Sequence, residues 1–220
     1  MITYDDLIKP IYDRLNVIYY LLHEQLNGLD RYKYNGKGFY SLNPNAIPIP
    51  DKIGGIYIMF EASEKYNDFD RVVRVGKAEK SLLTRLTQHF INLDKDHSIL
   101  RKHIGRSLLH KWEEENNVTY ESAVQDWNTK GVGNPELEEK VTEYLIDNIS
   151  FCLIPLTDKK QIRKLEQTLL EILSIHNRLH HETTGKYIQT DNWLGNYCKE
   201  NQRVMESGMW NDEHIRNWKK

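Results

Sequence analysis

The chain has few cysteines, no long apolar run and almost no net charge, and each shortage excludes a class of protein. Its two cysteines, Cys152 and Cys198, are far apart and fit no zinc spacing, so a disulfide scaffold is not expected and a reducing compartment is the simpler reading. No apolar stretch reaches the roughly 18 residues that a membrane span requires. The N-terminus carries Asp5 and Asp6 rather than a basic flank and an apolar core, so no signal peptide is visible. We therefore expect a cytoplasmic protein without a membrane segment.

The net charge is −2 over 220 residues, so the chain as a whole is not a polycation. Contact with a nucleic acid would therefore depend on local basic patches rather than on bulk charge. A phosphate-binding glycine loop, a serine nucleophile elbow and the zinc-protease helix pattern are all missing. His176, His180 and His181 come nearest to the last pattern, but no glutamate follows His176. We read these histidines as loop or surface residues.

What the chain does contain is a mixture of helical and strand patterns that predicts an α/β (α+β) domain. Apolar residues at helical spacing predict a long first helix over residues 3–25. Residues 27–53 are rich in glycine, asparagine and proline, and we expect them to form an extended lead-in without an element of its own.

Further elements follow from the same patterns. Strands are expected over residues 55–61, 71–76 and 149–156. Helices are expected over residues 80–91, 97–112, 135–148 and 158–174, with a short one near 120–127. After residue 177 we expect turns with one or two short helices.

Tyr57 is the first residue along these elements that could carry chemistry, because strand alternation separates it from Ile56 and Ile58. Most strand tyrosines are packing residues, so this position alone indicates little. On the helix over 80–91, Arg85 and His89 are four residues apart and share one face at the margin of the apolar arc. A guanidinium presents a fork of donors that matches phosphate oxygens, whereas the alternative is an ion pair with a structural carboxylate.

Glu166 projects into the apolar arc of the helix over 158–174, whereas Glu171 projects outside it. A buried carboxylate is costly, and it is usually neutralised, ion-paired or bound to a metal ion. Mg²⁺ would suit this position, because it commonly uses one or two protein carboxylates together with waters and phosphate. The alternative is an ion pair with Arg85 or another cation, and the pattern leaves both readings open.

Basic residues gather in two stretches, one over residues 71–89 with a single acidic residue and one over residues 101–106. Such local patches fit the footprint of a phosphate backbone. The candidates for DNA contact in these stretches are Arg74, Lys80, Arg101 and Lys102.

The candidate residues, taken in order, resemble the GIY-YIG nuclease superfamily. The ordered set comprises the strand Gly55-Ile56-Tyr57, the strand Arg74-Val75-Gly76-Lys77, the helix pair Arg85 and His89, and Glu166 on a later helix. The spacing of the helix pair and the run Val75-Gly76-Lys77-Ala78 look like the type II restriction enzymes of that superfamily. The core resemblance covers about residues 54–178, and segments at 97–109, 192–195 and 207–214 extend it across most of the chain.

The resemblance implies a small, three-stranded, mostly antiparallel sheet flanked by helices. It divides the chain into an N-terminal helix with its lead-in over residues 1–53, a catalytic core over 54–178, and a C-terminal extension over 179–220 that packs on the core.

The resemblance also implies one-metal hydrolysis of a DNA phosphodiester, with Mg²⁺ or Mn²⁺ as the cofactor. Tyr57 would act as the general base or would orient the attacking water, with Lys77 favouring its phenolate form. Arg85 would stabilise the charge that develops on the scissile phosphate. His89 would assist proton transfer or hold the phosphate. Glu166 would carry the metal ion, which would stabilise the leaving oxygen.

The sequence departs from the family pattern at two places. Arg74 replaces the tyrosine of the second motif, which bears on the assignment of the base. The family also places an asparagine beyond the metal-binding glutamate. Asn177, which we also count among the candidates for DNA contact, lies one residue closer than the usual separation, and Asn192 is an outside candidate.

We therefore expect a metal-dependent DNA endonuclease of a restriction-like or defence-related kind, since no separate DNA-binding domain is visible. One alternative is a catalytically weak DNA-binding protein of the same fold. Another is a repair or mobile-element nuclease that a partner directs to its target. Cleavage of a palindromic site would favour a homodimer.

Overall fold

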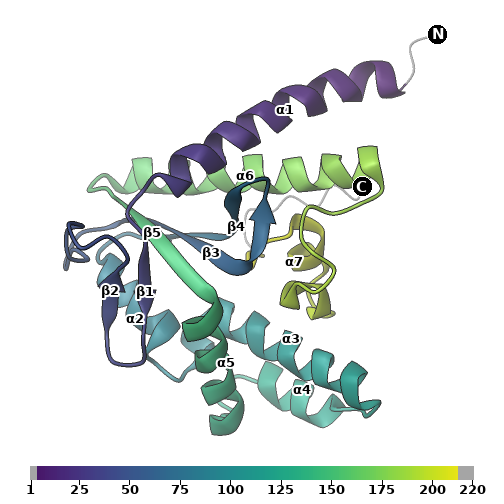
Figure 1. Cartoon of the computed structure of the whole chain (residues 1–220). Coiled ribbons are helices and arrows are strands. Elements are labelled where there is room, and N and C mark those ends of the chain that lie inside the picture. The colour runs from purple at the N-terminus through teal and green to yellow at the C-terminus, as the bar shows by residue number, and fades with distance from the viewer. Residues whose placement is uncertain (1–3, 213–220) are drawn as a thin grey trace.

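Residues 4–212 are built around one antiparallel sheet of five strands, in the order β2-β1-β5-β3-β4 (Figure 1). A computed structural model describes residues 4–212, with side chains from residue 8 onward. The strands are β1 (Tyr32–Tyr34), β2 (Phe39–Ser41), β3 (Gly55–Tyr66), β4 (Phe69–Ala78) and β5 (Ile149–Pro155). Residue 3 of the predicted first helix and residues 213–220 of the predicted C-terminal extension lie outside the described residues.

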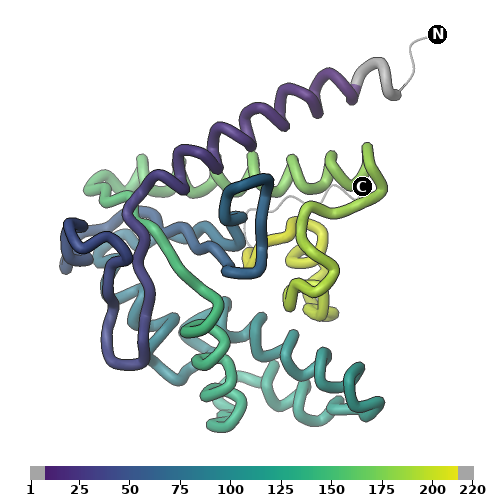
Figure 2. The backbone as a smooth tube through the Cα atoms, in the orientation of Figure 1, coloured from purple at the N-terminus to yellow at the C-terminus, as the bar shows by residue number. Residues whose placement is uncertain are grey.

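Helices cover both faces of the sheet. On one face α1 (Tyr4–Asn27) packs along α6 (Lys159–Thr184), and Figure 2 shows α1 continuing beyond the sheet. The other face is covered by α2 (Leu82–Phe90), α3 (Ile99–Asn116) and α5 (Pro135–Asn148), with α4 (Glu121–Asn128) packed on α3. After α6 come the short helix α7 (Gln202–Ser207), packed on α6, and the 3₁₀ turn η2 (Leu194–Tyr197), packed on α3. None of the helices in residues 4–212 is long and apolar enough to cross a bilayer.

The strand alternation of β3 creates two separate cores. Ile56, Ile58 and Phe60 are fully buried among the apolar residues of α1 and α6. Tyr57 and Met59 point to the opposite face, into the core formed with α2, α3 and α5. The predicted separation of Tyr57 from its neighbours is therefore confirmed.

Side-chain caps fix the starts of the helices that carry the candidate residues. The side chain of Ser81 accepts a hydrogen bond from the backbone N–H of Thr84 and thereby sets the start of α2. Ser98 caps α3 in the same way. Asp158 accepts hydrogen bonds from two backbone N–H groups in the first turn of α6, which fixes the register of Glu166 on that helix.

Several expectations about the fold were wrong. The sheet has five strands rather than three, because the supposed lead-in over residues 27–53 contains β1 and β2, and β1 pairs with β5. Helix α6 continues to Thr184, so the predicted boundary at residue 178 falls inside it. His176, His180 and His181 all lie on this helix rather than in a loop, and His176 is fully buried.

The edge of β4 is covered by residues 209–212, which we call the C-terminal strap. The backbone N–H of Trp210 donates to the carbonyl oxygen of Val73 over 2.6 Å. The side chain of Asn211 accepts from the N–H of Val75 (3.1 Å) and donates to its carbonyl oxygen (2.7 Å). These contacts satisfy backbone groups that an edge strand would otherwise leave unpaired, and they hold the strap beside the strand that carries Lys77.

Candidate active site

A cleft with a volume of about 210 Å³ opens beside β4. It lies where side chains from the two faces of the sheet meet around the edge strand, so that Tyr57 on one face comes close to Glu166 of α6 on the other. Four of the five residues predicted to be catalytic line it: Tyr57, Lys77, Arg85 and Glu166. Arg74, predicted to bind DNA, lines it as well. The fold thus brings together residues that are far apart in the sequence.

Tyr57 depends on the glycine opposite it in the sheet. Gly76 is its register partner on β4, and a Cβ atom on Gly76 would lie 2.1 Å from the Tyr57 hydroxyl oxygen. Only glycine therefore leaves room for the phenol ring to cross the strand. The Tyr57 hydroxyl oxygen lies 2.7 Å from Nε2 of His89. The ring is therefore positioned by Gly76 along its side and by His89 at its hydroxyl group.

His89 supports Tyr57 from beneath the cleft. Its imidazole is fully buried, and Nδ1 lies 2.7 Å from the hydroxyl oxygen of Ser98. Burial, together with the charges of Arg74 and Arg85, lowers the pKa of His89 well below its usual value of 6.5, so the ring is neutral. A neutral imidazole has one nitrogen that can accept a proton. The location of His89 favours its predicted part in proton transfer over contact with the phosphate.

Glu166 and Lys77 form an ion pair on the wall of the cleft. The side chain of Glu166 is 9% exposed and that of Lys77 is 26% exposed, so the pair lies at the cleft surface rather than in a closed core. Among residues 4–212, the cation that pairs with Glu166 is Lys77 and not Arg85. Nη1 of Arg85 donates to the side-chain oxygen of Gln88 (2.8 Å) and to the carbonyl oxygen of His97 (3.1 Å). Both acceptors are neutral, so neither of them compensates the positive charge of the Arg85 guanidinium.

Arg74 is buried and incompletely satisfied. Its Nη1 donates to the carbonyl oxygen of Trp210 in the strap, whereas its buried Nε has no hydrogen-bond partner among the described residues. Buried donors are normally paired, so an unpaired one on a cleft wall indicates a missing acceptor. A phosphate oxygen is such an acceptor. Arg74, Lys77 and Arg85 together make the cleft a good environment for an anion.

Two other residues predicted to bind DNA do not lie on the surface. Arg101 is fully buried in α3, where its Nε donates to Glu138 over 2.7 Å. Asn177 is buried and donates to the side-chain oxygen of Gln189 over 2.9 Å. Both side chains are committed to the interior, and the expectation that they contact DNA does not fit this structure.

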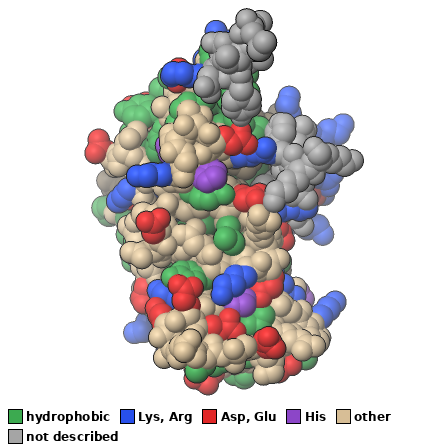
Figure 3. Space-filling view, turned by 90° about the vertical axis from the view of Figure 1, so that its right-hand side faces the viewer, with side chains coloured by type: hydrophobic (Ala, Val, Ile, Leu, Met, Phe, Trp, Pro, Cys, Tyr) green, Lys and Arg blue, Asp and Glu red, His purple; other side chains and the backbone are tan. Residues whose placement is uncertain are grey.

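The remaining predicted DNA contacts are only partly accessible. Lys80 is exposed just beyond the end of β4, whereas Lys102 is half-buried and donates to the carbonyl oxygen of Asn128 over 2.9 Å. On the face drawn in Figure 3, Lys and Arg side chains are interspersed with acidic ones rather than gathered in one field. Local basic groups, and not a broad basic surface, are what this face presents.

The contribution of the strap was not predicted from the sequence. Asn211 and Asp212 line the cleft beside Arg74. Neither residue lies in a regular element, and their approach to β4 depends on long-range contacts. The only sequence signal was that the surrounding segment, residues 207–214, looks like its counterpart in the family.

Comparison with known proteins shows that the chain matches a protein family. A family model described as "GIY-YIG domain" matches residues 22–219, a stretch that contains every residue lining the cleft. No curated protein and no solved structure matches the chain. The matched stretch is most of the chain, and its motif residues converge on one cleft. The chain belongs to the GIY-YIG nuclease superfamily.

Proposed function

We propose that this protein is a metal-dependent endonuclease that cuts DNA phosphodiester bonds in the cleft beside β4. Membership of the superfamily supports a nuclease that acts on DNA. The observation that carries the proposal is the convergence of Tyr57, Arg85 and Glu166 on one cleft, from a strand and two helices on opposite faces of the sheet.

In the proposed reaction, Tyr57 takes a proton from the attacking water while its own proton passes to the neutral imidazole of His89. The 2.7 Å contact between the two side chains supports this relay. Arg85 and Arg74 stabilise the charge that develops on the phosphate, because both guanidinium groups line the cleft. Lys77 holds the carboxylate of Glu166.

We propose Mg²⁺, or Mn²⁺, as the cofactor, with Glu166 as its protein ligand. Residues 4–212 contain no group of three side chains that could hold a metal ion, so a site made wholly of protein ligands does not fit. A site with one carboxylate does fit, because Mg²⁺ completes its shell with waters and phosphate oxygens. When bound, the ion would stabilise negative charge on the leaving oxygen.

A restriction-like or defence-related role is the setting that we propose for this activity. The support is the spacing of Arg85 and His89 and the run Val75-Gly76-Lys77-Ala78, which look like those of restriction enzymes in the superfamily. Cleavage of a palindromic site would require two copies of the cleft, and a homodimer would supply them.

The test is incubation of the purified protein with plasmid and phage DNA, in Mg²⁺ or in EDTA. Glu166→Gln is compared with Glu171→Gln, a matched change on the same helix outside the cleft. We expect cutting by the native protein and by Glu171→Gln, and none in EDTA or by Glu166→Gln. Cutting by Glu166→Gln would refute its metal role. Binding without cutting across a broad panel of DNA would favour the DNA-binding alternative.

A further inference from the structure

We propose that Asp212 of the C-terminal strap is a further catalytic residue, which orients the attacking water by accepting a hydrogen bond from it. The inference rests on the proposed nuclease function and adds a residue that lies outside the ordered motif set. Asp212 lines the same cleft as Tyr57, Arg85 and Glu166.

The backbone around Asp212 is fixed relative to the residues that would bind phosphate. Trp210 and Asn211 pair with β4, the strand that carries Arg74 and Lys77. On the other side, Nη1 of Arg203 donates to the carbonyl oxygen of Asp212 over 3.0 Å. Because the backbone around Asp212 is held from both sides, its carboxylate is positioned in the cleft with the precision that a reacting group needs.

The side chain of Asp212 is also oriented. Its Oδ2 lies 3.4 Å from Nε2 of His103, a fully buried residue of α3. Burial lowers the pKa of His103, so the ring is neutral, and Arg106 lies 3.4 Å from its Nδ1 as a donor. The tautomer with its proton on Nε2 satisfies the contacts with Arg106 and Asp212, although Nδ2 of Asn201, also a donor, lies 3.5 Å from the same Nε2. His103 is therefore a positioning residue.

The carboxylate of Asp212 remains accessible from the cleft. Its side chain lines the cleft and is 27% exposed. The hydrogen bond from His103 and the charge of Arg74 lower the pKa of Asp212, so the carboxylate is ionised at neutral pH. Asp212 thus presents a charged acceptor to whatever occupies the cleft.

The other groups that line the cleft are less suited to accept a hydrogen bond from the attacking water. Arg74, Lys77 and Arg85 can only donate hydrogen bonds. The Tyr57 hydroxyl already contacts His89, and the carboxylate of Glu166 is held by Lys77. An ionised carboxylate is also a stronger acceptor than a phenol. In the proposed reaction one hydrogen of the water goes to Tyr57, and Asp212 accepts a hydrogen bond from the other without taking its proton.

A negative charge beside a phosphate site opposes DNA binding, and this gives the proposal a distinctive signature. We expect Asp212→Asn to slow single-turnover cleavage of DNA in Mg²⁺ by about 100-fold, the loss that misplacement of a reacting group can cause. Its DNA affinity, measured by fluorescence anisotropy without metal, should stay the same or rise. Asp126→Asn, an exposed change on α4, is the control and should match the native protein in both assays.

The role of His103 is tested by a double-mutant cycle. His103→Gln should slow cleavage in the native background but add little in the Asp212→Asn background, because its effect passes through Asp212. Additive losses would mean that His103 acts on the fold and not through Asp212.

Each remaining outcome decides the matter. If the native protein cuts DNA and Asp212→Asn cuts it at an undiminished rate, the role of Asp212 is refuted but the proposed nuclease function is not. A slower rate accompanied by weaker DNA binding and a lower melting temperature, for both Asp212→Asn and Asp212→Ala, assigns Asp212 to folding and also overturns it. A native protein that cuts no DNA overturns the proposed function and this inference together.

Discussion

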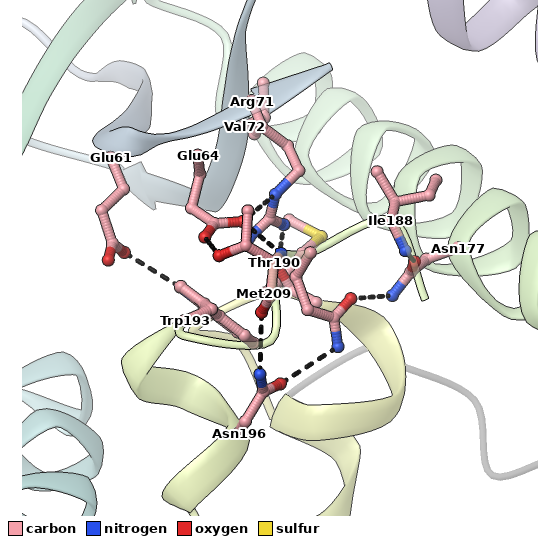
Figure 4. A network of polar contacts seen from close by, with 12 residues as sticks. Glu61, Glu64, Arg71, Val72, Asn177, Ile188, Thr190, Trp193, Asn196 and Met209 are labelled. Atoms are coloured by element: carbon pink, nitrogen blue, oxygen red, sulfur yellow. Dashed lines mark hydrogen bonds and ion pairs between the residues drawn. The ribbon is translucent and has the colours of Figure 1, made fainter. Parts of the chain in front are cut away.

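Two groups of buried charge each include an arginine of β4, and they differ in whether the protein itself satisfies them. One is the cleft around Arg74 and Glu166. The other is a closed network around Arg71 and Glu64, near the far end of the β3–β4 hairpin (Figure 4). Arg71 is only three residues from Arg74 along β4, yet the surroundings of the two guanidinium groups are opposite in kind.

In the closed network every nitrogen of the Arg71 guanidinium has an acceptor. Nε and Nη2 donate to Glu64 over 3.0 and 2.8 Å, and Nη1 donates to the carbonyl oxygen of Gly208. The backbone N–H of Thr190 also donates to Glu64, over 3.2 Å. The two charged side chains are 2% and 0% exposed. Arg74, by contrast, lies beside a cleft, and its Nε has no hydrogen-bond partner within residues 4–212.

A buried carboxylate therefore does not by itself mark a metal site. Glu61 accepts hydrogen bonds from the indoles of Trp193 and Trp210, and Glu138 pairs with Arg101. These carboxylates are enclosed by donors and serve the fold. Glu166 is distinguished by its place on the wall of an open cleft.

The largest effect on stability is expected from the closed network. Glu64→Gln leaves the charge of Arg71 buried without its counter-charge, and breaking a buried pair in this way costs about 3–5 kcal/mol. Unfolding in urea should show this loss. A cost below about 1 kcal/mol would mean that the network is not closed in solution, and the contrast with the cleft would fail.

A second change should act on the cleft side of the comparison. Gly76→Ala places a methyl group where the Tyr57 hydroxyl now lies, so the ring must move. We expect DNA cleavage to fall by about 100-fold, because a small misplacement of a reacting group costs that much. Gly38→Ala is the matched control, since no atom of the described part of the chain lies within 4 Å of the added Cβ. Equal rates for the two variants would show that the position of Tyr57 is not critical.

Lowering the pH should reduce the unfolding free energy gradually and by a smaller amount. A neutral histidine, His89, lies beneath the cleft, whereas the Arg71–Glu64 pair contains no histidine. Burial lowers the pKa of His89 well below 6.5 and that of His23 to about 4. The unfolded chain therefore binds protons below pH 6.5 that the folded protein does not, so the unfolding free energy falls as the pH falls through this window.

Each such histidine contributes up to about 1.4 kcal/mol per pH unit. His89→Gln should make the dependence shallower by that amount, in urea unfolding between about pH 7 and pH 5. An unchanged slope would mean that His89 is accessible to protons in the folded state.

Local patterns predicted much of the fold. The spacing of apolar residues gave α5 and β5 nearly their observed bounds, and Pro135 after the capping residue Asn134 marks the start of α5. The alternation around Tyr57 and the four-residue step from Arg85 to His89 are also local, and the structure keeps both. These features depend on neighbours in the sequence, and a single chain contains that information.

What the sequence could not supply depends on distant partners. β1 and β2 have three residues each, too few to show a period, and their turn residues indicated a loop. Arg101 looked like a surface cation until its pairing with Glu138 of α5 was visible. Asp212 reaches the cleft only because the strap pairs with β4.

The central claim is that Glu166 serves the reaction and Glu64 serves the fold. The most direct test measures unfolding in urea and DNA cleavage in Mg²⁺ on Glu166→Gln and Glu64→Gln side by side. We predict that Glu166→Gln abolishes cleavage and costs less than about 1.5 kcal/mol, since Lys77 is 26% exposed and can reach water. Glu166→Gln that still cuts DNA, or that loses as much stability as Glu64→Gln, would contradict this account.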